Sequence, residues 1–191
     1  RVTSVPLVML DLPYQSFDAY LASLPSKTRG YLKRKARARN DVRMEYRTSL
    51  DGIAQQVFEM FQDTLKQSKV DYGEFEQLEP DYFPRVMAAA GKSAQLVLAW
   101  AGEDLIGFQL SLVGERRIVT KHIGMRYPQG RDFSLYFLFW LEMIDFAIKH
   151  RIPSVEMGAT TYATKLLFGG HLSRRWLYFR FRGDVANFML Q

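Results

Sequence analysis

The sequence of 191 residues contains no cysteine. Disulfides, thiolate metal sites and a cysteine nucleophile are therefore excluded. The three histidines, His122, His150 and His171, do not have the spacing of a helical metal-binding pair. We therefore expect no bound metal. A G-x-S-x-G motif is also missing, so nothing indicates the strand-turn-helix serine of an α/β-hydrolase.

Long apolar runs are absent as well. The longest candidate for a membrane span, residues 134–148, is interrupted by Glu142 and Asp145. No signal peptide is recognisable, and the sequence starts at Arg1 rather than at a methionine. We therefore expect residues 1–191 to form a single domain excised from a longer chain. The expected location is the cytoplasm, including the inner face of the membrane.

Basic residues are in excess, with a net charge of +6. They form two groups: Lys27, Arg29, Lys33, Arg34, Lys35, Arg37 and Arg39 in one, and Arg174, Arg175, Arg180 and Arg182 in the other. Such groups predict an anionic partner, namely a phosphorylated cofactor, tRNA or a membrane surface. Because the first group lacks interleaved aromatic residues for base stacking, we expect contact with phosphates and no sequence-specific DNA binding.

Hydrophobic periodicity and turn residues predict the order of the elements. Strands are expected over residues 5–12, 42–48, 95–101, 105–113, 117–124, 155–157 and 172–182. Helices are expected from Ser16 to 24, over 27–39, from Ser49 or Asp51 to 69, over 81–90, from a capping Ser134 to 150, and from Thr160 or Thr161 to 168. Residues 70–78 and 127–133 are expected to be loops. Two short polar turns separate the strands between residues 95 and 124, which predicts an antiparallel meander. The chain is therefore expected to be one α/β (α+β) domain with a mixed sheet.

A meander that leads into a loop, a long helix, a strand and a helix ending in Phe-Gly resembles the GNAT acyltransferase fold. Two stretches resemble more specifically the Fem-type aminoacyl (peptidyl) transferases. One is Phe17–Arg29 with the basic helix that follows it. The other is Gly158-x-x-x-Tyr162-x-x-Lys165-x-x-Phe168-Gly169. The resemblance implies a twisted, mainly antiparallel sheet with helices on both faces.

In GNAT proteins the strand-loop-helix unit binds the pyrophosphate of acyl-CoA with backbone N–H groups. The resemblance therefore implies acyl-CoA, most simply acetyl-CoA, as a co-substrate. The matching residues are Ile123, Gly124, Met125, Arg126, Gly130, Arg131, Asp132, Phe133, Ser134 and Leu135. The usual Arg/Gln-x-x-Gly-x-Gly/Ala signature is incomplete here, because the second glycine is missing and Pro128 removes one N–H donor.

Four residues are catalytic candidates. Lys165 is placed to pair with an anionic substrate group or to polarise a carbonyl, and the alternative is a surface lysine on a helix. Tyr162, one turn earlier, is either a general acid or a packing residue. Glu156 is either a base that acts through water or a salt-bridged carboxylate. His122 is either a base near neutral pH or a satisfied histidine within the sheet. Core packing accounts for the aromatic residues of the long helix, Phe137, Phe139 and Trp140.

Three functions remain open at this point. The first is an N-acyltransferase that moves an acyl group from acyl-CoA to an amine, on a small molecule or on an envelope or polysaccharide precursor. The second is a Fem-like transferase that uses aminoacyl-tRNA. The third is a catalytically inactive GNAT-like domain. Contact with tRNA or an anionic membrane through Lys27–Arg39 is expected for the second and third.

Overall fold

The computed structural model describes residues 2–68 and 77–178. Its strands are β1 (Val2–Asp11), β2 (Arg43–Arg47), β3 (Ala94–Ala101), β4 (Asp104–Val113), β5 (Ile118–Met125), β6 (Ser154–Gly158) and β7 (His171–Leu177). Its α-helices are α1 (Phe17–Ser23), α2 (Ser26–Ala36), α3 (Ala54–Gln67), α4 (Tyr82–Ala90), α5 (Gln129–Asp132), α6 (Leu135–Lys149) and α7 (Tyr162–Leu167). Two 3₁₀ helices, η1 (Arg37–Asn40) and η3 (Gly91–Ser93), follow α2 and α4.

The seven strands form one sheet in the order β2-β3-β4-β5-β6-β1-β7. All neighbours pair antiparallel except β5 and β6, which are parallel. The meander predicted from the two polar turns is β3-β4-β5. The mixed, mainly antiparallel sheet is confirmed, and with it the expected fold class.

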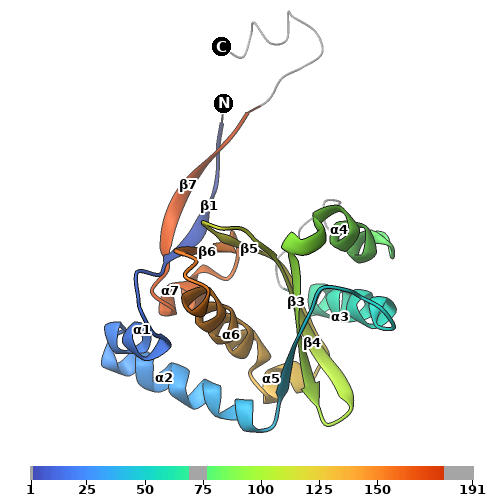
Figure 1. The fold of residues 1–191 in the computed structure, drawn as a ribbon, viewed down its shortest axis with the longest axis horizontal. Helices are drawn as coiled ribbons and strands as arrows, with labels where there is room; N and C mark the ends of the chain where they lie inside the picture. The colour runs from blue at the N-terminus through green and yellow to red at the C-terminus, as the bar shows by residue number, and fades with distance from the viewer. Residues whose placement is uncertain (1, 69–76, 179–191) are drawn as a thin grey trace, which may run out of the picture.

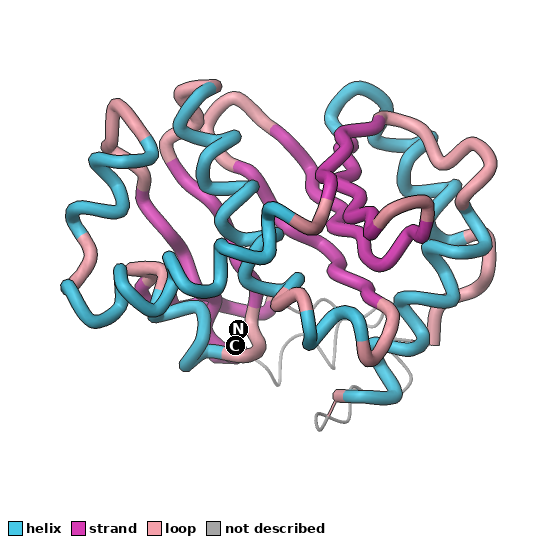
Figure 2. The backbone as a smooth tube through the Cα atoms, turned by 90° about the horizontal axis from the view of Figure 1, so that it is seen from below, coloured by secondary structure: helices cyan, strands magenta, loops and turns pink. Residues whose placement is uncertain are grey.

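Helices cover both faces of this sheet (Figures 1 and 2). On one face, α3 and α4 contribute Val57, Phe61 and Phe83 to a core with Leu98 and Phe108 of the meander. On the other face, α6 lies at the centre of a larger core, and α1 and α2 pack beside it. Most of α6 is buried, which accounts for its nearly continuous apolar sequence.

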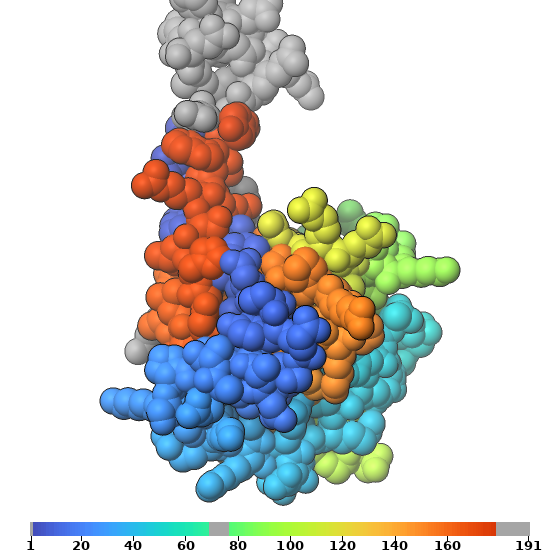
Figure 3. Space-filling view, turned by 60° about the vertical axis from the view of Figure 1, so that its left-hand side comes forward, coloured from blue at the N-terminus to red at the C-terminus, as the bar shows by residue number. Residues whose placement is uncertain are grey.

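At one end of the sheet, β1 pairs with the edge strand β7 from Val2↔Leu177 to Met9↔His171. Figure 3 shows β7, in red-orange, along one side of the molecule next to the N-terminal residues in blue. The strand predicted over residues 172–182 is β7, and its last residues lie outside the described part of the chain. Residues 70–76 of the predicted loop also lie outside it.

The helix boundaries show which capping signals were correct. Ser16 caps α1 as predicted, because its hydroxyl accepts a 3.1 Å hydrogen bond from the Ala19 amide. The basic segment predicted as one helix is α2 followed by the 3₁₀ turn η1.

The segment that leads into α6 differs from the prediction. Residues 127–133 were expected to be a loop, but they contain α5, a single helical turn. Ser134 was expected to cap α6 with its side chain. It makes no capping bond and adopts a left-handed conformation with φ of 52°. The reason is local: α5 ends immediately before Ser134, so the chain reaches α6 from a helical turn rather than from the extended backbone that a capping serine needs.

Candidate functional site

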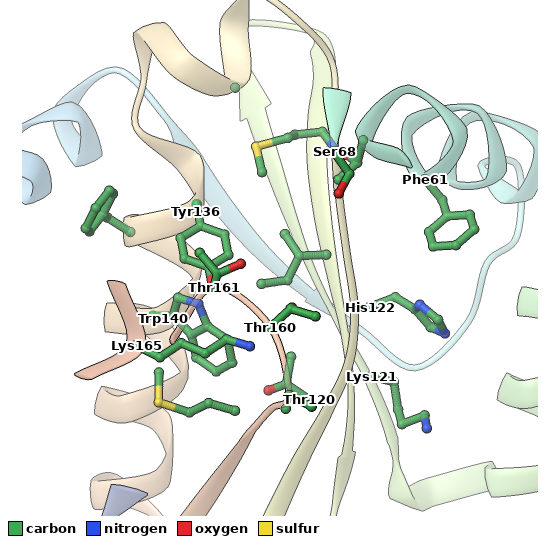
Figure 4. A pocket seen from close by; sticks show the side chains of 18 of the residues that line it. Phe61, Ser68, Thr120, Lys121, His122, Tyr136, Trp140, Thr160, Thr161 and Lys165 are labelled. Atoms are coloured by element: carbon green, nitrogen blue, oxygen red, sulfur yellow. The ribbon is translucent and has the colours of Figure 1, made fainter. Parts of the chain in front are cut away.

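A cavity of about 1040 Å³ opens where β5 and β6 diverge. The two strands pair only at Ile118↔Val155 and Val119↔Glu156. Beyond these pairs the sheet separates, and the gap is bordered by the C-terminal part of α3, by α5 and α6, and by the segment between β6 and α7. Figure 4 shows β5 running through this region, with side chains on both of its sides. The divergence exposes backbone and side chains that a continuous sheet would cover.

Lys165 is the most deeply buried cation of the cavity wall, with 4% of its surface exposed. Burial lowers the pKa of its ammonium group to about 8, because the charged form loses hydration. Within the described part of the chain, no carboxylate lies within ion-pair distance of it. Among the described residues, its positive charge therefore has no ion-pair partner, and it faces the cavity.

The motif around Lys165 has a structural explanation. Gly158 ends β6 with φ of 84°, and a Cβ atom there would lie 3.5 Å from the Lys165 Nζ. The Tyr162 hydroxyl donates a 2.8 Å hydrogen bond to the Pro6 carbonyl, which fastens α7 to β1. Phe168 is fully buried against Phe137 of α6. The motif thus fixes the position of α7, and with it that of Lys165.

Two roles were considered for Tyr162, a general acid and a packing residue. Its hydroxyl is committed to β1, and Tyr162 is not among the described residues that line the cavity. The structure therefore does not bring the proposed general acid to the site.

Glu156 does line the cavity, on β6 at the point of divergence. Its side chain is 18% exposed, and a carboxylate oxygen lies 3.5 Å from Arg117 Nη1. The carboxylate is therefore ion-paired with Arg117, and it also lines the cavity.

His122 borders the cavity from the opposite side of β5 (Figure 4). Its ring lies among Phe61, Tyr82 and Phe83, and Nε2 is 2.9 Å from the Tyr82 hydroxyl. Burial lowers its pKa to about 4, so the ring is neutral at physiological pH. The cause of this placement is a β-bulge: Ser111 pairs with Thr120, but Leu110 pairs with His122. The extra residue turns His122 away from the face that carries Thr120 and Lys165.

Of the ten residues expected to bind the cofactor, half lie on the cavity wall. Five line the cavity: Ile123, Met125, Gly130, Arg131 and Ser134. The other five do not. Gly124 packs tightly under α3, Leu135 is fully buried, and Arg126 reaches the Leu105 carbonyl and Glu59. Asp132 and Phe133 also lie outside the described lining.

The backbone N–H groups from Gly130 to Ser134 are already used. The amide of Gly130 donates to the Arg126 carbonyl at 2.8 Å, and those of Arg131 and Asp132 both donate to the Pro128 carbonyl. The amides of Phe133 and Ser134 donate to Gln129 and Arg131. The turn at α5 therefore uses these five amides, which are among the donors expected to bind a pyrophosphate.

Two cations stand near the start of α6. Lys35 of α2 donates a 3.2 Å hydrogen bond to the Ser134 hydroxyl and lies over the rings of Tyr31 and Phe137. Arg131 donates to the Gln67 side chain at 2.7 Å and lies over Tyr127. In the described part of the chain, both contact neutral groups and aromatic rings and neither has a carboxylate within ion-pair distance, which leaves their charge available to a ligand.

Sequence reasoning did not single out three groups at this site. Lys35 was only one member of the basic segment, although its spacing from Tyr31 placed both on one helix face. Trp140 was assigned to core packing, and it is indeed 1% exposed, yet it also lines the cavity beside Lys165. Thr120 faces the cavity because of the bulge, which no sequence pattern indicated.

Neither a metal-binding cluster nor a membrane-spanning helix is found in the described residues. In residues 2–68 and 77–178, no group of three or more histidine, aspartate or glutamate side chains is arranged to hold a metal ion. No helix within the same residues has the length and apolar character needed to cross a membrane.

Comparison with known families then decides the assignment. The model of the FemAB-like family, described as peptidoglycan biosynthesis/recognition, matches residues 7–176. The chain belongs to the FemAB-like family. No curated protein matches this FemAB-like chain by sequence.

Solved structures show the same fold. FemX superposes with a TM-score of 0.72 at 12% identity, over 90% of this chain and 60% of FemX. L-PGS from Bacillus licheniformis gives 0.63 at 11% identity, over 99% of this chain and 64% of that protein. A tandem GNAT protein from the clavulanic acid biosynthesis pathway gives 0.56 at 14% identity, over 91% of this chain and 52% of that protein. The FemAB-like chain thus has the GNAT fold and spans less than two thirds of each of these proteins.

Proposed function

We propose that this FemAB-like chain transfers an aminoacyl group from aminoacyl-tRNA to an amine of a cell-envelope precursor. One observation carries the proposal: Lys165 is a buried cation without a carboxylate partner among the described residues, at the point where β5 and β6 diverge. A group of this kind suits a reaction in which negative charge develops on a carbonyl oxygen.

In this reaction the acceptor nitrogen attacks the carbonyl carbon of the aminoacyl ester. A C–N bond forms, the bond from carbon to the ribose oxygen breaks, and the proton lost by nitrogen is gained by the ribose oxygen. The Lys165 ammonium stabilises the oxyanion formed in between. Among the described residues that line the cavity, Glu156 is the one carboxylate. It accepts the proton from the amine through a water molecule. No covalent enzyme intermediate is needed, which fits the absence of cysteine.

The choice of donor rests on the segment before α6. Acyl-CoA was the first expectation, but the amides from Gly130 to Ser134, which were expected to contribute to pyrophosphate binding, donate hydrogen bonds within the α5 turn. Lys35 and Arg131 remain at the mouth of the cavity as side-chain ligands for phosphate. Exposed cations of α2 and η1 continue from Lys35 along the surface: Lys27, Lys33, Arg34 and Arg37. An extended basic surface suits an RNA backbone better than a single cofactor.

The choice of acceptor rests on the family. Its description as peptidoglycan biosynthesis/recognition favours an amine on a peptidoglycan precursor over an unrelated small molecule. Arg175 of β7, on another part of the cavity wall, supplies a further cation for an anionic acceptor.

The test compares donors directly. Transfer of a labelled amino acid from aminoacyl-tRNA to an amine-bearing peptidoglycan precursor is measured beside transfer from acetyl-CoA. We expect transfer from aminoacyl-tRNA, reduced roughly 100-fold in Lys165→Ala. Turnover with acetyl-CoA alone would refute the donor assignment. The absence of turnover with both donors, in folded protein, would favour the inactive binding domain.

Binding experiments separate the individual phosphate interactions. Lys35→Glu and Arg131→Glu should weaken tRNA binding. For each phosphate that the variant no longer neutralises, the slope of log K against log salt should become shallower by about 0.7. Lys92→Glu is the matched control, because Lys92 is an exposed lysine of η3 away from the cavity. Equal effects in all three variants would show only a general effect of net charge.

A further inference from the structure

The Lys165 ammonium lies over the aromatic ring of Trp140. Its Nζ lies 5.9 Å from the ring centre of Trp140, a residue of α6 that is 1% exposed. On another side it faces the backbone of Gly158, where a Cβ atom would lie 3.5 Å away. Figure 4 shows Lys165 and Trp140 together on the α6 side of the cavity.

Within residues 2–68 and 77–178, the other charged groups of the cavity wall do not supply a counter-ion. Four are cations, on α2, β5, α5 and β7: Lys35, Lys121, Arg131 and Arg175. Glu156 of β6 is paired with Arg117. His122 lies on the opposite side of β5, and Tyr136 of α6 meets Trp140 edge to face. Among the described residues, the negative face of the indole is therefore the main attraction for the ammonium group.

An aromatic face suits this task better than a carboxylate would. A carboxylate would raise the pKa of the lysine and would compete with a substrate oxygen for its N–H groups. An indole face attracts the cation within about 6 Å through its quadrupole and takes up no N–H donor by a conventional hydrogen bond. The donors of the ammonium group stay available for the cavity.

We infer that Trp140 is the positioning residue of Lys165: its ring face holds the ammonium group where β5 and β6 diverge, so that the N–H donors face an incoming carbonyl oxygen. The statement that the Lys165 donors face a substrate carbonyl rests on the proposed function. The contact between ring and ammonium does not rest on it.

The test weakens the negative charge of the ring face while keeping an indole ring at position 140. The protein has three tryptophans, Trp100, Trp140 and Trp176. In a Trp100→Phe/Trp176→Phe background, Trp140 is replaced by fluorotryptophans with one to four fluorine atoms, which withdraw charge from the ring face. The pKa of Lys165 is measured by NMR of the lysine side chains, with Lys165→Met to assign the signal. We expect a stepwise fall, reaching roughly half a unit at four fluorine atoms.

The matched control keeps Trp100 instead, in a Trp140→Phe/Trp176→Phe background. Trp100 also has a cation over its ring, Arg43 at 5.3 Å, and it does not line the cavity. Fluorination of Trp100 should leave the pKa of Lys165 unchanged. An unchanged pKa in the Trp140 series, or an equal shift in both series, would overturn the inference.

The measurement also separates this inference from the proposed function, because it needs no substrate. A stepwise shift without aminoacyl transfer would support the positioning role and refute the function. Transfer without any shift would do the reverse. Where both hold, the alkaline limb of the pH profile for kcat should move to lower pH with fluorination, which a purely structural role of Trp140 would not produce.

Discussion

The hydroxyl of Tyr20 donates a 2.9 Å hydrogen bond to the carbonyl of Phe168. These residues are far apart in sequence, and each belongs to one of the two stretches that resemble Fem-type transferases. Tyr20 comes from α1, and Phe168 follows α7 directly. The bond therefore connects the N-terminal helices to the helix that carries Lys165. The two stretches thus form one unit, in which the first supports the position of the second.

Removal of this hydroxyl should cost stability. Tyr20 is 1% exposed, so Tyr20→Phe leaves the buried Phe168 carbonyl without its donor. We expect the free energy of unfolding in urea to fall by about 1–2 kcal/mol. Tyr14→Phe is the matched control, since the Tyr14 hydroxyl takes part in an exposed hydrogen bond with Ser23. A loss of the same size in both variants would contradict the role given to Tyr20.

Gly124 should prove essential for packing rather than for cofactor binding. A Cβ atom there would lie 2.2 Å from a ring carbon of Phe108 and 2.9 Å from the Phe61 amide nitrogen. Gly124→Ala must therefore push α3 away from β5, at a cost of about 3 kcal/mol. Gly30→Ala is the opposite case, because the nearest atom is 3.9 Å away and the site is within α2. It should stabilise the protein by about 0.5–1 kcal/mol. Thermal unfolding of both variants tests the contrast.

His122 should make the protein sensitive to acid. Its pKa is about 4 in the folded protein and 6.5 in the unfolded chain, so the folded state favours the neutral ring. The stability contributed by this preference is complete above pH 6.5 and is lost as the pH falls through 4. It amounts to about 2 kcal/mol after allowance for the partial exposure of the ring.

The variant His122→Gln keeps a hydrogen-bonding group opposite the Tyr82 hydroxyl but does not titrate. Its unfolding free energy, measured from pH 7 to pH 4, should therefore fall less steeply than that of the wild type. His150→Gln, at an exposed histidine, should keep the wild-type slope. An unchanged slope in His122→Gln would show that another group causes the acid sensitivity.

The order of the elements could be predicted from the sequence because it depends on local patterns. Strand alternation and the glycine turns at Gly102 and Gly114 were sufficient for the meander. The helix expected up to Phe168 is α7, and Tyr162 and Phe168 of the motif each make a contact that fixes it.

The contents of the site were less predictable because they depend on long-range geometry. A single extra residue in β5 decides that Thr120, and not His122, shares a face with Lys165. Strand alternation alone would place both on the same face. Similarly, Pro128 and Gly130 are turn residues by local preference, yet their backbone closes into α5 and uses the amides expected to bind pyrophosphate. Neither the bulge in β5 nor the closure of α5 can be predicted from a pattern in a single sequence.

Lys165 should be needed for activity and unfavourable for stability. Its pKa is about 8 in the folded protein and 10.5 in the unfolded chain, so folding penalises the ammonium form. The penalty, about 3 kcal/mol, is present in full below pH 8 and is relieved as the pH rises towards 10.5. The wild-type protein should therefore gain stability over this alkaline range. Lys165→Met, which fills a similar volume without the charge, should be more stable than the wild type at pH 7 and should lose the alkaline gain.

The control for this variant is Lys92→Met, at an exposed lysine, which should behave as the wild type does. Urea unfolding at pH 7 and pH 10 distinguishes the three proteins. A Lys165→Met variant less stable than the wild type at pH 7 would mean that the ammonium has a counter-ion and contributes to folding. A stabilised variant that no longer transfers aminoacyl groups would instead show that the protein keeps a costly buried charge because the reaction requires it.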